Sequence, residues 1–289
     1  MEWVNAVVQG ILLGGVFALF ATGLSLAFGI MRLANLAHGT LALLAAFIAY
    51  SIVDATGVNP LVALLAVVPI MFVVGYVLER GLLNFTLGSD PLPAILVTFG
   101  LAIVIENLLL ERYSADARGL DAGSIESASI RVTDDIAIGW FPLMTLAVAV
   151  GVLGLLYLLF ARTRAGRAFR AISDDRATGR LMGIDDRHYY ALAMGIALAT
   201  VAIAGVFLGI RTTFSPADGN AQLLFGFEAV IIGGLGSLWG TLAGGIVLGV
   251  AQTVGAEIEP GWSVLTGHLV FLAVLALRPN GLLGKAAPT

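Results

Sequence analysis

Long apolar stretches separated by short polar turns dominate the chain. A window of about 19 residues marks segments that can cross a hydrocarbon core of about 30 Å, at about 1.5 Å per residue. Eight such segments are found, at residues 4–29, 33–53, 60–79, 92–110, 140–161, 190–210, 226–254 and 262–278. The pattern predicts an all-α, polytopic helical membrane protein with a single domain over residues 1–289. The first segment lacks the basic start and the cleavage site of a signal peptide, so we expect it to be retained.

Two polar loops differ in the sign of their charge. Loop 111–139 contains three Arg against six Asp and Glu, and loop 162–189 contains seven Arg against four Asp. Short loops rich in Arg and Lys stay in the cytoplasm. The pattern therefore predicts that 162–189 is cytoplasmic and that 111–139 is external.

The number of crossings conflicts with the charge near the end of the chain. Three crossings after the basic loop would place the C-terminus outside, whereas Arg278 and Lys285 favour the inside. Region 211–254 is rich in Gly and contains Pro216, so it can hold two passes, one of them short, or a re-entrant piece. Alternatively, segment 33–53 only dips into the membrane, which would move the N-terminus inside. We therefore expect at least one broken or re-entrant segment, and the side of each terminus stays open.

The composition excludes several classes of protein. Hydrophobic residues make up 59% and charged residues 12%, against about 45–50% and about 25% in ordinary soluble domains. There is no Cys and there are only three, widely separated His, so we expect neither a metal site nor a cofactor. A net charge of −4 gives no nucleic-acid footprint.

The sequence lacks the motifs that would let this chain drive transport by hydrolysis itself. A phosphate-binding loop G-x-x-x-x-G-K-[ST] needs a Lys, and the only Lys is Lys285, near the C-terminus. A nucleophile elbow G-x-S-x-G is also absent, so a membrane enzyme is disfavoured. If transport is driven by hydrolysis, that reaction must occur on another polypeptide.

The basic loop contains a candidate helix that a partner could push. Its signals are a cap, two acids in the first turn, a base near the end and a glycine that can adopt a left-handed conformation; these are Ser173, Asp174, Asp175, Arg180 and Gly183. Upstream, Arg167 and Arg170 follow Gly166 and share one helical face. A compact helix here could sit in a groove of a partner and transmit rigid-body motion. The alternative is a basic loop that rests on anionic lipid headgroups.

Four stretches, in order, resemble the branched-chain amino acid ABC transporter permeases of the LivH/LivM type. They are Gly23–Met31 followed by Asn35–Gly39, the pair Glu79-Arg80, the loop motif Gly166–Ile184, and Ala229–Ser237 with Gly240, Gly244 and Gly245. The matches run from about residue 10 to residue 284, nearly the whole chain, and look closer to LivH. Two positions depart from the family pattern: Asn84-Phe85 replaces an Arg-Pro dipeptide, and Thr40 stands where relatives often have an acid.

The resemblance implies a permease subunit of an ATP-driven importer in the cell membrane. Such a subunit would pair with a second, LivM-like permease, two cytoplasmic ATP-binding subunits and an extracytoplasmic binding protein. The substrate would be a branched-chain or other hydrophobic amino acid, although a related branch of permeases also suggests urea or short amides. The implied ATPase-coupling residues are Gly166, Arg167, Arg170, Asp174, Asp175 and Gly183. A self-contained secondary transporter or channel is the alternative from another class, and it predicts ion-coupled uptake without an ATPase.

Polar residues within the apolar segments are candidates for the translocation pathway. Asn35 and His38 are three residues apart, which predicts a shared helical face beside Gly39. Such groups either line the pathway or form a hydrogen bond between helices. Glu106 either faces the pathway or is exposed at the membrane interface, and Glu228 either faces the pathway or stabilises a helix N-terminus.

A block of glycines near the C-terminus predicts close helix packing. Small residues four apart allow helices to approach closely in a membrane, and the candidates are Gly233, Gly234, Gly236, Gly240 and Gly244. Breaks within 215–236 could instead expose helix N-termini whose dipoles attract a substrate carboxylate.

Overall fold

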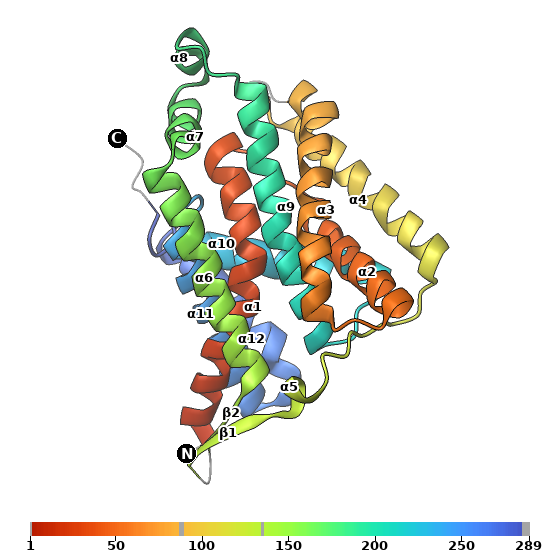
Figure 1. Cartoon of the computed structure of the whole chain (residues 1–289). Helices are drawn as coiled ribbons and strands as arrows, with labels where there is room; N and C mark the ends of the chain where they lie inside the picture. The colour runs from red at the N-terminus through yellow and green to blue at the C-terminus, as the bar shows by residue number, and fades with distance from the viewer. Residues whose placement is uncertain (1, 87–89, 134–135, 285–289) are drawn as a thin grey trace.

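The computed structural model describes residues 2–86, 90–133 and 136–284, and long helices dominate it (Figure 1). The α-helices are Glu2–Met31 (α1), His38–Thr56 (α2), Pro60–Gly81 (α3), Leu92–Tyr113 (α4), Ser124–Ser127 (α5), Trp140–Arg162 (α6), Arg164–Asp174 (α7), Arg176–Leu181 (α8), Asp186–Arg211 (α9), Gly219–Gly233 (α10), Leu238–Ile258 (α11) and Ser263–Leu277 (α12). Short 3-10 helices cover Leu83–Phe85 (η1), Pro216–Asp218 (η2) and Pro260–Trp262 (η3). Within the described ranges, eight helical segments are long and apolar enough to span a membrane, which confirms the predicted polytopic helical fold.

Loop 111–139, the acidic loop, contains the only two β-strands among the described elements. Strands Ser129–Thr133 (β1) and Ile136–Gly139 (β2) form an antiparallel hairpin that the sequence pattern did not predict. A second contact holds this loop on the bundle, because Arg118 and Phe214 exchange two backbone hydrogen bonds of 2.9 and 2.8 Å. The hairpin and the N-terminus lie at one end of the molecule, and α8 lies at the other (Figure 1).

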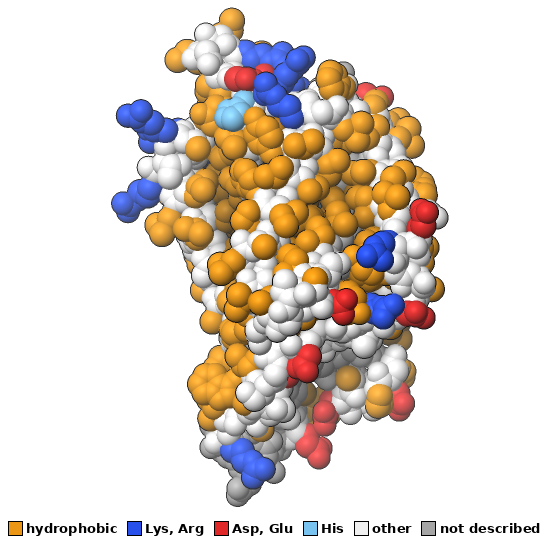
Figure 2. All heavy atoms as spheres, turned by 45° about the vertical axis from the view of Figure 1, so that its right-hand side comes forward, with side chains coloured by type: hydrophobic (Ala, Val, Ile, Leu, Met, Phe, Trp, Pro, Cys, Tyr) orange, Lys and Arg blue, Asp and Glu red, His pale blue; other side chains and the backbone are white. Residues whose placement is uncertain are grey.

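Apolar side chains form a broad belt between these two ends. Figure 2 shows the belt on one face, with Arg side chains gathered around α8 above it and most of the visible acidic side chains toward the hairpin end. Because lipid tails accept apolar but not charged groups, this belt is the surface that the bilayer covers.

Residues 226–254 do not form one span, so that prediction is wrong in detail. The helix breaks after Gly233, and α11 starts only at Leu238. The resulting α10 has 15 residues, about 22 Å of helix and less than the thickness of a hydrocarbon core. The break suspected within 211–254 is therefore present, between Gly233 and Leu238.

The short α10 resolves the conflict over the termini. Its last turn lies beside the C-terminal segment, since Leu282 N and Leu283 N donate to Ile232 O and Gly233 O at 2.8 and 3.0 Å. The chain therefore returns from the hairpin end to the α8 end through residues 212–233, of which α10 is the last part, and crosses twice more through α11 and α12. The described C-terminal end lies near α7, and the N-terminus lies at the opposite end (Figure 1).

Both α2 and α10 begin inside the bundle. The first residue of α2, His38, lies against Phe20 and Gly23 of α1. Gly23 is eight residues before the end of α1, about 12 Å along the helix. Residues 32–37 therefore turn back into the protein after α1 ends, and α10 starts at the same depth because Gly219 contacts Gly39.

The two halves of the chain make matching contacts. Helix α1 packs on α11, and α9 packs on α3; α2 contacts α4 and α9, as α10 contacts α12 and α1. Since α1 runs toward the α8 end and α9 runs away from it, α1–α4 and α9–α12 form an inverted pair (Figure 1). Two interrupted helices at corresponding positions are typical of transporters built from inverted repeats.

Candidate functional site

Helix α7 fastens the basic loop to the membrane helices. Thr163 caps its start, because the Thr163 hydroxyl oxygen accepts a hydrogen bond from Gly166 N at 3.0 Å. Phe169 is buried against the bundle. The Ser173 hydroxyl donates to Gly29 O at 2.7 Å, near the end of α1. Helix α7 is therefore held at both of its ends.

The first predicted coupling residues occupy the fold between α6 and α7. A Cβ atom on Gly166 would lie 2.4 Å from Phe160 O, so only glycine lets α7 fold back this closely. Arg170 Nη1 donates to the same Phe160 oxygen at 2.8 Å, which satisfies a carbonyl of the last turn of α6. Arg167 is exposed. Both arginines are exposed, and Arg170 in addition stabilises the fold between α6 and α7 through its hydrogen bond.

The prediction of one helix that starts at Ser173 is wrong. Ser173 and Asp174 end α7, and Asp175 interrupts the helix with φ −148° and ψ 106°. The short helix α8 then starts at Arg176, and Gly183 adopts the expected left-handed conformation after it, with φ +80°. The reason for the shift is the hydrogen bond from the Ser173 hydroxyl to Gly29 O, which uses the group that would otherwise cap the helix.

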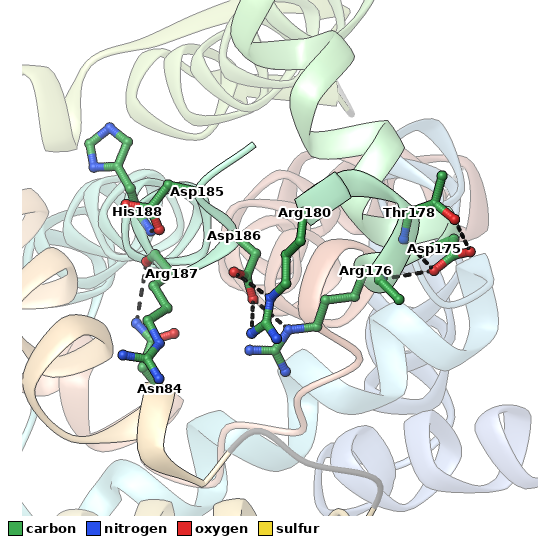
Figure 3. A network of polar contacts seen from close by, with 10 residues as sticks. Asn84, Asp175, Arg176, Thr178, Arg180, Asp185, Asp186, Arg187 and His188 are labelled. Atoms are coloured by element: carbon green, nitrogen blue, oxygen red, sulfur yellow. Dashed lines mark hydrogen bonds and ion pairs between the residues drawn. The ribbon is translucent and has the colours of Figure 1, made fainter. Parts of the chain in front are cut away.

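Asp175 is the residue that caps α8. Its Oδ1 accepts hydrogen bonds from Ala177 N and Thr178 N at 2.9 and 3.1 Å, and its Oδ2 accepts one from the Thr178 hydroxyl at 2.6 Å (Figure 3). These bonds, the Thr178 hydroxyl first, lower the pKa of the Asp175 carboxyl below its usual range. The cap gives a six-residue helix a defined start.

A pair of arginines anchors α8 to the start of α9. Asp186 accepts from Arg180 through both of its oxygens, at 2.9 Å from Nε and 2.8 Å from Nη2, and from Arg176 Nε at 2.5 Å (Figure 3). The Asp186 side chain is only 6% exposed, and the Arg176 guanidinium also lies 5.2 Å from the ring centre of Tyr190. The hydrogen bonds to Asp186 and its negative charge raise the pKa of Arg180.

Two apolar side chains form the tip of this anchored helix. Leu181 and Met182 are 87% and 78% exposed. Exposed apolar side chains beyond the lipid-facing belt are typical of a contact with another protein. The sequence reasoning selected charged and glycine residues of this loop and missed Leu181, Met182 and the Asp186 anchor. A Leu-Met pair within an otherwise polar, basic loop was the available signal.

The candidate pathway residues Asn35 and His38 do not share a helical face, so that prediction is wrong. Asn35 lies in the non-helical turn 32–37, where its Oδ1 accepts a hydrogen bond from Ala37 N at 3.0 Å. His38 Nε2 lies 2.9 Å from Phe20 O and is buried. Both side chains thus stabilise the point where α2 begins inside the bundle.

Gly39 lies where the starts of α2 and α10 touch. A Cβ atom on Gly39 would be 2.0 Å from Gly219 O, and one on Gly219 would be 2.6 Å from the Thr40 hydroxyl oxygen. Two helix N-termini, each with a partial positive charge, therefore meet at depth with no space for a larger residue.

Glu228 lies well inside α10, so it does not stabilise the N-terminus of that helix. Its carboxylate is 2% exposed and contacts His268 Nδ1 of α12. The His268 ring stacks on Phe225 with ring centres 6.1 Å apart. The pair joins α10 to α12 within the membrane region.

Glu106 lies away from these residues, on α4. It is partly buried, and the adjacent Asn107 amide donates to Ile103 O at 2.8 Å within the same helix. Helix α4 packs on α2 and η2, whereas Glu228 contacts α12. Gly39 thus lies against the start of α10, and Glu228 lies farther along α10. Glu106 lies on α4, away from both of these residues.

The glycine block serves two different purposes. Gly233, Gly240 and Gly244 lie where α10 and α11 cross; a Cβ atom on Gly244 would be 2.0 Å from a backbone oxygen of α10. Gly234 and Gly236 have φ of +104° and +78°, so they form the turn between the two helices.

A cavity of about 800 Å³ opens at the α8 end between α1, α6, α7 and the α10–α11 turn. Arg170, Asp174 and Gly236 line it, together with Arg32, whereas no candidate pathway residue does. Among the residues that the structure describes, no group of three or more His, Asp and Glu could hold a metal ion.

A family model decides the class of this protein. The model described as "Branched-chain amino acid transport system / permease component" matches residues 6–276. The chain belongs to this family. It is therefore a multi-pass permease component of the cell membrane and a transport subunit rather than an enzyme.

Relatives in this permease family resemble the chain over nearly its whole length. The chain is 26% identical to the high-affinity branched-chain amino acid transport system permease protein BraD of Pseudomonas aeruginosa, over 98% of this chain and 96% of BraD. It is 27% identical to LivH of Escherichia coli K12, over 96% of this chain and 94% of LivH. It is also 29% identical to LivM of that organism, over 44% of this chain and 30% of LivM. The similarity to LivH is thus the more extensive one.

Both departures from the family pattern lie at structural junctions. Asn84 of η1 donates from Nδ2 to Arg187 O at 3.3 Å, which joins the end of α3 to the start of α9 (Figure 3). Thr40 is buried where α2 meets Gly219. The neutral side chain of Thr40 therefore lies where the starts of the two broken helices, α2 and α10, touch.

Proposed function

We propose that the chain is the permease subunit of an ATP-driven importer for branched-chain or other hydrophobic amino acids. In this proposal, residues 1–289 form one permease domain with loop 162–189 in the cytoplasm and loop 111–139 outside. A separate ATP-binding subunit hydrolyses ATP and moves the membrane helices through α7 and α8. The substrate class is supported by the names of BraD and LivH.

The observation that carries the proposal is the exposed apolar tip of an anchored helix. Leu181 and Met182 protrude from α8, and Asp186 holds α8 on the long helix α9. Burying two large apolar side chains in a groove of a partner would contribute about 1.5–3 kcal/mol for each. The anchor then transmits a movement of the tip to α9, which is buried among the other helices.

The proposed assembly has a second permease and three further subunits. The similarity to LivM supports a homologous second permease. Two ATP-binding subunits would each contact one permease loop, with Gly166, Arg167, Arg170, Asp174, Asp175 and Gly183 shaping the contact. An extracytoplasmic binding protein would deliver the amino acid at the hairpin end. No cofactor within the permease is needed for this cycle.

The proposed pathway follows the broken helices. The starts of α2 and α10 meet at Gly39, with Asn35 and His38 holding the turn before α2. Helix N-termini attract a carboxylate, so separation of α2 and α10 would expose a place for the substrate carboxylate at depth. Glu228 on α10 would move with this opening, and Glu106 would contribute from α4.

The test replaces the apolar tip in the assembled transporter. In the double variant Leu181→Asp and Met182→Asp, we expect the ATP-binding subunit to bind at least about 100-fold more weakly, the equivalent of about 3 kcal/mol. ATP-dependent uptake of leucine into proteoliposomes should fall with it, while the melting temperature of the permease stays unchanged. Ala177→Asp is the matched control, because Ala177 is exposed on the same helix and adds little apolar surface. Undiminished binding and uptake in the double variant would contradict the proposal.

The inverted pair of broken helices favours one other candidate function, a self-contained secondary transporter. That function predicts leucine uptake driven by an ion gradient in proteoliposomes that contain the purified chain alone. We expect no such uptake without the ATP-binding subunits. Uphill transport by the chain alone would replace the importer proposal.

A further inference from the structure

Glu79 is a fully buried carboxylate without a hydrogen-bond partner. It lies in the last turn of α3, its exposure is 0%, and neither of its oxygens has a partner among the described residues. It continues the buried face of α3 that contains Val67, Met71 and Gly75, spaced four residues apart. Because Gly75 packs against Met194 of α9, this face lies on α9.

The α8 anchor and Glu79 both approach Tyr190 of α9. Helices α3 and α9 run in opposite directions (Figure 1), so Glu79, one turn beyond the contact of Gly75 with Met194, lies at the level of Tyr190. This places Glu79 within electrostatic range of Arg176. Arg176 also contacts the Tyr190 ring and donates to Asp186. Glu79 on α3 and Asp186 on α9 are therefore two acidic groups within the influence of one cation on α8.

The two carboxylates differ in how well they are satisfied. Asp186 accepts three hydrogen bonds, and its bidentate pair with Arg180 would remain if Arg176 moved away. Glu79 accepts none, and a buried carboxylate without a partner is costly. A transfer of Arg176 from Asp186 to Glu79 would thus satisfy the second acid while the first keeps a strong ion pair.

We infer that Glu79 is a second acceptor for the Arg176 guanidinium, so that α8 exchanges a contact with α9 for one with α3 when the ATP-binding subunit loads the Leu181–Met182 tip. This inference rests on the proposed function. Glu79 is then a positioning residue: it fixes a second place for α8 and makes α3 follow the movement of the loop. Two discrete ion-pair arrangements of one packed element are a recurrent basis of conformational switching.

The first test separates transport from ATP hydrolysis. In the complete transporter, Glu79→Gln keeps the shape of the side chain and removes its charge. We expect the ATP-binding subunit to remain bound and to hydrolyse ATP, while leucine imported per ATP falls on the order of tenfold. Glu79→Asp should restore part of this ratio. Asp185→Asn is the matched control, because Asp185 pairs with Arg80 between the same helices at 3.7 Å but is exposed.

A structural role for Glu79 would give a different result. The melting temperature of Glu79→Gln should equal or exceed that of the unmodified protein, since the change replaces a buried ionisable carboxyl group that has no hydrogen-bond partner. A lower melting temperature together with an unchanged ratio of uptake to hydrolysis would overturn the inference.

The second test follows the position of α8 directly. The chain has no Cys, so spin labels can be attached at Ala177→Cys on α8 and at Val77→Cys on the exposed face of α3. We expect the distance between the labels to become shorter when the complex binds ATP, and to stay at its nucleotide-free value in Glu79→Gln. An identical shift in both proteins would overturn the inference and leave the importer intact. Failure of the unmodified permease to bind an ATP-binding subunit would instead overturn the proposed function.

Discussion

The contact between α1 and α11 and the contact between α8 and α9 are built from opposite kinds of interaction. Where α1 meets α11, Gly10, Gly14, Gly245 and Gly249 let the backbones approach so closely that any Cβ atom would collide. Where α8 meets α9, charged side chains at Asp186 make the contact, and the tip of α8 is exposed. A close backbone contact is lost as soon as the two helices separate, whereas an ion pair can exchange partners while the helices stay packed. The membrane helices are therefore suited to move as rigid bodies and the loop is suited to move against them.

The largest effect is expected from filling the glycine contacts. Gly249→Val would place Cβ 2.3 Å from Gly10 O of α1, and overpacking of this kind costs more than about 3 kcal/mol when the backbone must shift. We expect little folded protein, measured by yield and by size-exclusion chromatography in detergent. Gly154→Ala is the control, because nothing lies within 4 Å of its Cβ position; it should fold as well as the unmodified chain. Equal yields of the two variants would remove the distinction between the two regions.

A large effect on transport, with a small effect on folding, is expected from releasing α8. Asp186→Ala removes the acceptor of both Arg176 and Arg180. We expect ATP-driven leucine uptake to fall on the order of tenfold, while the yield of folded permease stays close to normal because the membrane helices do not depend on this contact. A collapse of the folded yield would show that the loop anchor is part of the rigid body.

An intermediate effect on stability is expected from the polar contact within the membrane region. Glu228→Ala leaves the His268 ring without its buried partner, which should cost about 1–3 kcal/mol. The melting temperature in detergent should fall, and Glu228→Gln should retain most of the stability because an amide still reaches the ring. If both variants melt like the unmodified chain, α12 is held by apolar packing alone.

The smallest effect is expected from the exposed ion pair near the anchor. Arg80 and Asp185 are 3.7 Å apart with side chains that are 49% and 58% exposed. Such pairs contribute about 0–1 kcal/mol and are screened by salt. Arg80→Gln should leave the melting temperature and the uptake almost unchanged, and a large loss would indicate that Arg80 contacts a partner subunit.

Some residues of the coupling loop could be chosen from the sequence and others could not. Gly183 follows a capping rule that depends on local backbone geometry, and its left-handed conformation was predicted correctly. Asp175 was predicted within the first turn and is instead the cap, because Ser173 is engaged by Gly29, 144 residues away in the chain. No local rule contains a contact at such a separation.

The pathway candidates show the same limit. Asn35 and His38 have the spacing of one helical face, yet the chain turns back between them because the start of α2 packs against the middle of α1. For Glu228 the sequence left open the pathway or a helix N-terminus, because the segment 226–254 gave no sign that the helix begins as early as Gly219. Glu79 was noticed only as part of a motif, since its missing hydrogen bonds become visible only when α3, α8 and α9 are assembled.

The apolar pattern alone was sufficient for the membrane class and for most helix positions, because lipid imposes length and polarity on every residue that enters it. The presence of a broken segment followed from the Gly-rich composition of 211–254 and from the conflict between the number of crossings and the charge near the C-terminus. The arginine-rich loop and the spacing of the glycines could also be recognised within single segments of the sequence. Only the folded chain decided that α2 and α10 begin at a common depth, that the halves form an inverted pair, and that Arg176 pairs with Asp186 within electrostatic range of Glu79. Each of these depends on which distant segments touch, and helix packing in a membrane is set by the shapes of both surfaces together.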